Sequence, residues 1–135
     1  MANNWTMADV ERLQKKKQQS NGSTSQKRFQ ALGRLKAGTM NKTEAAYANL
    51  LEARKRAGEI LWYSFEPINI RLAKNTFYKV DFLVMTAEGY LEAHEVKGFW
   101  TDDARVKIKI ASEKIPVLKF VAARLEKNNW IYEHF

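Results

Sequence analysis

The chain has 135 residues and no cysteine, and its 23 Lys and Arg residues against 15 Asp and Glu residues give a formal net charge of +8. This length suits one domain with a sizeable core, and the lack of cysteine excludes disulfides and thiolate metal sites. No apolar run approaches the roughly 20 residues of a membrane span, and no signal peptide is recognisable, so we expect a soluble protein.

The positive charge is concentrated in residues 1–40, which hold eight Lys and Arg residues and two acids. Residues 14–28 are polar, basic and nearly free of apolar side chains, so they cannot bury enough surface to order themselves. We therefore expect a largely flexible basic arm at 1–40 and a folded domain at 41–135. The arm is either a solvated tail or a contact for a polyanion, with nucleic acid first and an anionic membrane surface second. Lys15, Lys16 and Lys17 are then candidates for salt-sensitive contacts with the DNA backbone.

A helix is predicted to begin at Asn41, a good N-cap residue, and to stop at Gly58. Glu44 falls at the third helical position, as in a capping box. It also lies on the flank of the apolar stripe that contains Tyr47 and Leu51. Glu44 is therefore either a helix cap or part of a functional site.

Four strand-like runs follow, at residues 59–65, 67–72, 77–85 and 90–98. The third run carries one acid, Asp81, among apolar residues. The fourth carries Glu95 and Lys97, which project from one face because side chains alternate along a strand. His94 faces away from Glu95 and is interpreted as structural.

The connection between the last two runs decides whether Asp81 and Glu95 meet. A three-residue loop with Gly89 in the left-handed conformation is a common hairpin geometry. It pairs Thr86 with Tyr90 and places Asp81 directly opposite Glu95, on the same face. A loop one residue shorter or longer would put the two acids on opposite faces.

Two carboxylates this close repel, so one of them would keep its proton unless a cation lies between them. A divalent metal would resolve the repulsion. The alternative is an exposed acidic face on which Lys97 is an ordinary counter-charge.

A second helix is predicted from Thr101, with Asp102 and Asp103 in its first turn, to Pro116. Capping explains these two aspartates better than metal binding. Lys107 lies beside the inner apolar stripe and is the best candidate for reaching a phosphate. Val106 and Ile110 form a second apolar patch, which indicates burial on both sides or a subunit contact. Further strands are expected at 117–123 and 130–133, and Phe99, Trp100 and Trp130 are interpreted as core or interface residues.

The order of helix with Glu44, strands, Asp81, Glu95-Val96-Lys97, helix and strand resembles the PD-(D/E)xK nuclease superfamily. This superfamily includes restriction enzymes and Holliday-junction resolvases. The run 41–44, Asp81-Phe82 and Glu95–Gly98 with the basic helix after Thr101 is similar to small phage-encoded nucleases. The similarity covers residues 41–125, and Val80 replaces the proline that names the motif.

The resemblance implies an α/β fold of α+β type, with a restriction-endonuclease-like αβββαβ core whose mixed central sheet is flanked by helices, plus a C-terminal hairpin strand. It also implies that Asp81, Glu95 and the Val96 carbonyl bind Mg²⁺ or Mn²⁺, with Glu44 binding directly or through water. Lys97 would orient or help deprotonate the attacking water, and Lys42 and Lys107 would contact DNA.

The leading hypothesis is thus a Mg²⁺- or Mn²⁺-dependent DNA endonuclease, structure-selective for branched or recombination intermediates and acting as a homodimer. By resemblance it would be a phage protein in the host cytoplasm, with DNA rather than a membrane as its partner. The alternative is a nucleic-acid-binding protein with the same fold and no catalysis. A third hypothesis is a packaging or assembly accessory whose acids are surface features.

Overall fold

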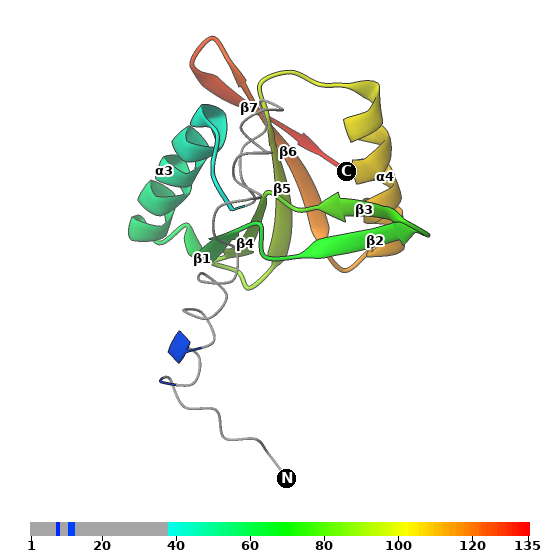
Figure 1. The fold of residues 1–135 in the computed structure, drawn as a ribbon. Helices are drawn as coiled ribbons and strands as arrows, with labels where there is room; N and C mark the ends of the chain where they lie inside the picture. The colour runs from blue at the N-terminus through cyan, green and yellow to red at the C-terminus, as the bar shows by residue number, and fades with distance from the viewer. Residues whose placement is uncertain (1–7, 9–10, 13–37) are drawn as a thin grey trace. The chain divides into compact units, whose positions relative to one another are not determined.

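The structure is a computed structural model that describes Ala8, Glu11, Arg12 and residues 38–135. Residues 40–135 form one compact unit of mixed α/β structure (Figure 1). Its elements are α3 (Lys42–Arg56), β1 (Ile60–Phe65), β2 (Asn69–Ala73), β3 (Thr76–Lys79), β4 (Phe82–Thr86), β5 (Leu91–Lys97), α4 (Asp102–Lys114), β6 (Lys119–Glu126) and β7 (Asn129–His134).

Helix α3 begins as the sequence predicts. The Glu44 backbone N–H donates to the Asn41 side chain at 2.9 Å, and the Asn41 N–H donates to the Glu44 carboxylate at 2.8 Å. This reciprocal capping box satisfies two backbone donors that a helix start leaves without partners. The helix buries Tyr47 and Leu51, and Gly58 follows its end with a positive φ of 79°.

The main sheet has five strands in the order β1-β4-β5-β6-β7. Neighbouring strands are antiparallel except for β5 and β6, which run parallel because α4 carries the chain back across one face. The sheet is therefore mixed, as expected, and β7 is the predicted C-terminal hairpin strand. The predicted hairpin of β4 and β5 is also confirmed: Phe82 pairs with His94 and Leu83 with Ala93, and Gly89 has a φ of 89°.

The prediction of one continuous strand at 77–85 was wrong. The chain bends at Asp81, so that β3 pairs with β2 in a separate two-stranded sheet while β4 joins the main sheet. The cause lies in the partner strand, where three residues at 66–68 lie between β1 and β2 against two at 80–81. Glu66 has a positive φ of 46°, and its N–H donates to the Asp81 carbonyl at 2.8 Å. An extra residue of this kind bends a strand pair.

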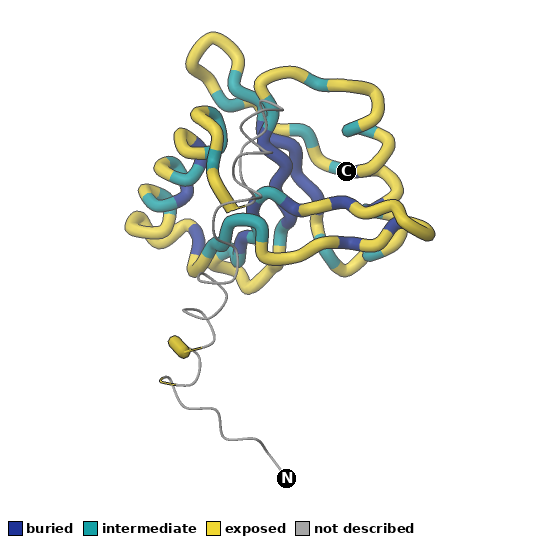
Figure 2. The backbone as a smooth tube through the Cα atoms, in the orientation of Figure 1, coloured by how far each residue is buried: buried dark blue, intermediate teal, exposed yellow. Residues whose placement is uncertain are grey.

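Buried residues are concentrated in the strands of the main sheet (Figure 2). Their apolar side chains form two clusters, one under each helix. Helix α3 covers one face, and α4 with the β2–β3 hairpin lies on the other (Figure 1). The cluster under α3 contains Tyr47, Leu51, Ile60, Phe82, Val84, Val96 and Ala123. The cluster under α4 contains Ile70, Leu72, Tyr78, Val80, Ala93, Ile108, Ala111, Phe120 and Ala122. Val106 and Ile110, on the outer side of α4, are exposed.

Candidate active site

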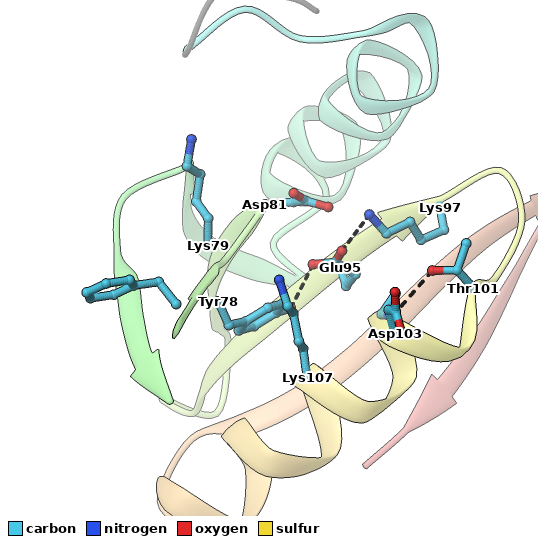
Figure 3. Close-up of a pocket in the computed structure, with 10 residues that line it drawn as sticks. Tyr78, Lys79, Asp81, Glu95, Lys97, Thr101, Asp103 and Lys107 are labelled. Atoms are coloured by element: carbon cyan, nitrogen blue, oxygen red, sulfur yellow. Dashed lines mark hydrogen bonds and ion pairs between the residues drawn. The ribbon is translucent and has the colours of Figure 1, made fainter. Parts of the chain in front are cut away.

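Asp81, Glu95 and Lys97 come together at the end of β5 where the chain enters the connection to α4 (Figure 3). Lys97 Nζ lies 2.8 Å from Glu95 Oε1. The Asp81 carboxylate accepts a hydrogen bond from the Val96 backbone N–H at 2.8 Å, through Oδ2. Asp81 precedes β4 by one residue and Glu95 follows His94 by one, so the confirmed register places the two acids opposite each other. Both line the same cavity, as the hairpin predicted.

Tyr78 completes the surroundings of Glu95. Its hydroxyl donates to Glu95 Oε2 at 2.7 Å, so both carboxylate oxygens of Glu95 have partners on this chain. Glu95 is only 5% exposed, and two charge-assisted contacts of this kind offset the cost of burying it. Burial and the neighbouring Glu95 carboxylate raise the pKa of Tyr78, which therefore remains a hydrogen-bond donor.

The acidity of Asp81 is also strongly perturbed. Burial, and then the Glu95 carboxylate, raise its pKa to about 7 from an ordinary value of 3.8, although the Val96 N–H and Lys97 act against the increase. The repulsion expected between paired carboxylates is therefore present, and near neutral pH Asp81 is divided between its acid and its carboxylate.

The pKa of Lys97 is raised as well, but for a lysine this favours the charged form. Burial alone would lower its pKa, but the Glu95 carboxylate at 2.8 Å, together with Asp81 and Glu44, outweighs burial and raises the pKa. The ammonium is thus cationic at neutral pH. This favours a part in stabilising negative charge over a part as a proton acceptor.

The two acids open into a cavity of about 320 Å³. Lys107 enters it from α4, and Asp103 lies at the start of the same helix (Figure 3). Contact of Lys107 with a phosphate stays a prediction. The cavity is lined by Phe77, Tyr78, Lys79, Asp81, Glu95, Lys97, Thr101, Asp103, Ala104 and Lys107. Three lysines and three acids therefore share one opening, a composition suited to an anionic ligand held beside a cation.

Three of the other predicted residues do not line this cavity. Val96 is only 4% exposed, and metal binding by its carbonyl stays a prediction. Glu44 caps α3 and acts on Asp81 and Lys97 only as a nearby charge, so its binding to a metal stays a prediction. Lys42 is exposed at the start of α3 and does not line the cavity. Lys15, Lys16 and Lys17 lie outside the described residues.

In residues 38–135 no three His, Asp or Glu side chains are grouped as in a preformed metal site. The donor chemistry nevertheless fits a hard divalent cation. Asp81 and Glu95 are two partly or fully buried carboxylates whose mutual repulsion a cation would relieve. Such an ion would obtain its remaining ligands from water and from phosphate oxygens, as Mg²⁺ commonly does.

Sequence reasoning missed Tyr78 and Lys79, and it preferred helix capping to metal binding for Asp103. The β3–β4 bend brings the first two to the site, and the strand pattern contains no signal for it. Phe99 is 76% exposed, so of the core and interface roles predicted for it only the interface role stays open, whereas Trp100 and Trp130 pack against the two cores. His94 is buried on the α3 face, with Tyr47 and Glu92 as partners, so its structural interpretation agrees with the structure.

Comparisons with protein-family models, with curated proteins and with solved structures found no match. Neither α3 nor α4 has the length and apolar character that crossing a membrane requires. Function is therefore argued from the site itself.

Proposed function

We propose that this protein is a metal-dependent endonuclease that hydrolyses DNA phosphodiester bonds with Asp81, Glu95 and Lys97. The observation that supports the proposal best is the pair of facing carboxylates, Asp81 and Glu95, that line one cavity with the Lys97 ammonium 2.8 Å from Glu95. Perturbed acids in a cavity are a marker of functional sites. Setting the β2–β3 hairpin aside, the order α3, β1, β4, β5, α4, β6 is that of the αβββαβ core that the resemblance implies.

Each residue has a distinct task in this proposal. Asp81 and Glu95 would hold Mg²⁺ or Mn²⁺, with the Val96 carbonyl as a further ligand. Glu44 would bind the metal directly or through water. When bound, the metal lowers the pKa of water and neutralises charge on the phosphate. Lys97 donates to a phosphoryl oxygen or to the attacking water, since its raised pKa keeps it protonated. Tyr78 orients Glu95 through the 2.7 Å hydrogen bond, as supporting residues do around metal-binding carboxylates.

A cleavage assay tests the proposal. Supercoiled plasmid, linear duplex and a four-way junction are incubated with Mg²⁺, Mn²⁺ or EDTA. We expect metal-dependent cleavage that EDTA abolishes. Asp81→Asn, Glu95→Gln and Lys97→Met should each lower the rate about 100-fold or more, the range for loss of a charge-stabilising group.

Glu88→Gln and Lys119→Met are matched controls. Both residues are exposed and lie outside the cavity, so these variants should cleave at the wild-type rate. Absence of cleavage with either metal, or cleavage that survives all three site substitutions, would contradict the proposal. DNA binding without cleavage would favour the non-catalytic alternative.

The proposal includes a homodimer that acts on branched or recombination intermediates in the cytoplasm of a phage-infected host. Val106 and Ile110 support it, as two exposed apolar side chains four residues apart on the outer face of α4. Preference for the four-way junction over linear duplex in the same assay would support this substrate.

A further inference from the structure

The β2–β3 hairpin has one buried face and one exposed face, because side chains alternate along each strand (Figure 2). The buried face belongs to the cluster under α4 and carries Ile70, Leu72, Tyr78 and, just after β3, Val80. The exposed face carries two cross-strand pairs, Asn69 with Lys79 and Arg71 with Phe77. The second face is therefore turned away from α4 and toward solvent.

Two hydrogen bonds hold this hairpin in place in addition to its apolar face. Lys114, in the last turn of α4, donates from Nζ to the Leu72 carbonyl at 2.9 Å. The Tyr78 hydroxyl donates to Glu95 of the candidate site at 2.7 Å. The exposed face is thus held in a fixed position next to the cavity, which residues 77–79 help to line.

The hairpin is the most cationic stretch of the folded unit. Residues 67–80 contain three exposed cations, Arg71, Lys74 and Lys79, and no acid. Residues 40–135 hold 15 Lys and Arg residues and 13 acids. Without the three cations of the hairpin the folded unit would therefore have more acids than bases, so its excess of positive charge lies here.

Neighbouring acids neutralise little of this charge. Lys79 Nζ lies 3.6 Å from a Glu66 carboxylate oxygen, and the Lys79 side chain stays 47% exposed. Within the described part of the chain neither Arg71 nor Lys74 forms an ion pair, and the Arg71 Nε–H donates to the Ala73 carbonyl at 3.4 Å. A group of exposed cations without acidic partners attracts a polyanion.

We propose that the exposed face of the β2–β3 hairpin, with its turn, binds the phosphate backbone of duplex DNA next to the cavity, through Arg71, Lys74 and Lys79. This inference rests on the proposed nuclease function and adds the surface that would position the duplex flanking the scissile phosphate. Contacts of this kind fix the register and orientation of a protein on DNA without reading its sequence.

The dimensions of the hairpin fit this partner. At a rise of about 3.3 Å per residue, Arg71 lies ~7 Å along the hairpin from the pair that contains Lys79, and Lys74 lies up to ~10 Å further. Each DNA strand carries one phosphate per ~3.4 Å of helix axis, so this length spans several phosphates. A two-stranded β-ribbon is also narrow enough to enter the major groove, which is about 12 Å wide.

The salt dependence of binding tests the proposal. Binding of the full-length protein to a blunt duplex is measured by fluorescence anisotropy over a KCl series, in EDTA so that metal-dependent cleavage does not occur. The double variant Arg71→Gln, Lys74→Gln should lower the slope of log affinity against log salt concentration by about 2, which is about 1 per phosphate contact. The control Arg56→Gln, Lys127→Gln removes the same charge at exposed positions outside the cavity and should keep a slope close to that of the wild-type protein.

Cross-linking tests the same contact with all cations in place. The chain contains no cysteine, so a single introduced cysteine can carry a photo-reactive cross-linker. Ala73→Cys places it at the exposed end of β2, and the control Ala87→Cys places it in the exposed turn between β4 and β5. Position 73 should cross-link to the duplex much more efficiently than position 87. Thermal unfolding of each variant verifies its fold.

A decrease in slope no greater than that of the control, or equal cross-linking from the two positions, would overturn the inference. Hairpin-dependent binding to phosphatidylserine vesicles with an unchanged slope on DNA would also overturn it and assign the surface to a membrane. The result is separable from that of the proposed function. Metal-dependent cleavage with an unchanged slope would reject only the hairpin contact. Hairpin-dependent duplex binding by a protein that never cleaves would reject the nuclease activity and leave a DNA-binding surface.

Discussion

At the scale of single residues, Asp81 is the group whose state depends most on its surroundings. Burial first, and the Glu95 carboxylate second, raise its pKa to about 7. Lys97 forms its ion pair with Glu95. A cation bound between the two acids would favour the ionised form of Asp81, so protons and metal compete for the same carboxylate. The acidity of Asp81 is therefore linked to folding, and it would also be linked to the binding of the proposed metal.

The first prediction is a dependence of stability on pH in the metal-free protein. An acid whose pKa is higher in the folded chain binds an additional proton there between the two pKa values, so stability falls as pH rises through that interval. For Asp81 the interval runs from an ordinary 3.8 to about 7. Thermal unfolding in EDTA should therefore show a midpoint that decreases from pH 5 to pH 8.

Asp81→Asn should remove this part of the decrease, because the amide does not titrate, while the exposed Glu113→Gln should leave it unchanged. Adding Mg²⁺ should raise the midpoint of the wild-type protein more at pH 8 than at pH 5. A wild-type profile that Asp81→Asn reproduces in full would show that another group causes the dependence.

At the scale of elements, local chemistry explains what the sequence predicted well. The capping box at Asn41 and Glu44 and the left-handed Gly89 are short-range devices with clear residue preferences, so the start of α3 and the register of β4 and β5 followed from a few residues. That register was sufficient to pair Asp81 with Glu95.

The break between β3 and β4 could not be predicted in the same way. It arises from an extra residue in the facing strand, where Glu66 adopts a positive φ without being glycine or asparagine. Such a bulge depends on pairing between segments about 15 residues apart, and a single strand's alternation does not encode it. The alternation of apolar and polar residues therefore did not predict the contact between Tyr78 and Glu95.

His94 connects α3 to β5 and shows how an element is held in place. Its Nδ1 lies 2.6 Å from the Tyr47 hydroxyl, and its Nε2 lies 2.8 Å from a Glu92 carboxylate oxygen. His94 is 2% exposed and Tyr47 is fully buried, so neither can replace its partner with bulk water. The hydrogen bond with His94 holds the pKa of Glu92 below its ordinary value, which keeps this acid ionised as the acceptor from Nε2.

The second prediction follows from this arrangement. Tyr47→Phe removes the hydroxyl and leaves His94 Nδ1 buried without a partner, which should lower the free energy of unfolding by about 1–3 kcal/mol. Urea unfolding should show a lower midpoint with an unchanged slope. The control is Tyr63→Phe, whose hydroxyl donates to the partly exposed Glu52 at 2.9 Å and whose loss should cost under ~1 kcal/mol because water can substitute. An equal loss of unfolding free energy in the two variants would contradict the inference that buried His94 depends on the Tyr47 hydroxyl as its partner.

At the scale of the whole molecule, positive charge and the candidate site belong to different parts of the chain. Residues 1–39 hold eight of the 23 Lys and Arg residues and two of the 15 acids. The rest of the chain, which contains the cavity, is therefore nearly balanced. If DNA is the substrate, the N-terminal part should supply affinity that does not depend on sequence, and the cavity should supply selection at the scissile phosphate.

The third prediction separates these two contributions. Deleting residues 1–39 keeps Met40, which packs against the core under α3, and so should leave the folded unit intact. Each phosphate contact contributes about 0.9 to the slope of log affinity against log salt concentration, so the slope should decrease by up to ~7 if all eight cations contact DNA. Replacing Lys15, Lys16 and Lys17 by Gln should account for up to ~3 of that decrease.

The control removes the same charge from the folded unit, at the exposed residues Lys55, Arg56 and Lys127, which lie outside the cavity. Its slope should remain close to that of the wild-type protein, because proximity to the DNA path and not net charge decides how many counterions are released. Equal slopes for the full-length and truncated proteins would favour the alternative that residues 1–39 are a solvated tail without DNA contacts. In that case Lys79, Lys97 and Lys107, which line the cavity, would be left as the principal cations for phosphate binding at the site, and substituting them by Met should then reduce the salt dependence that remains.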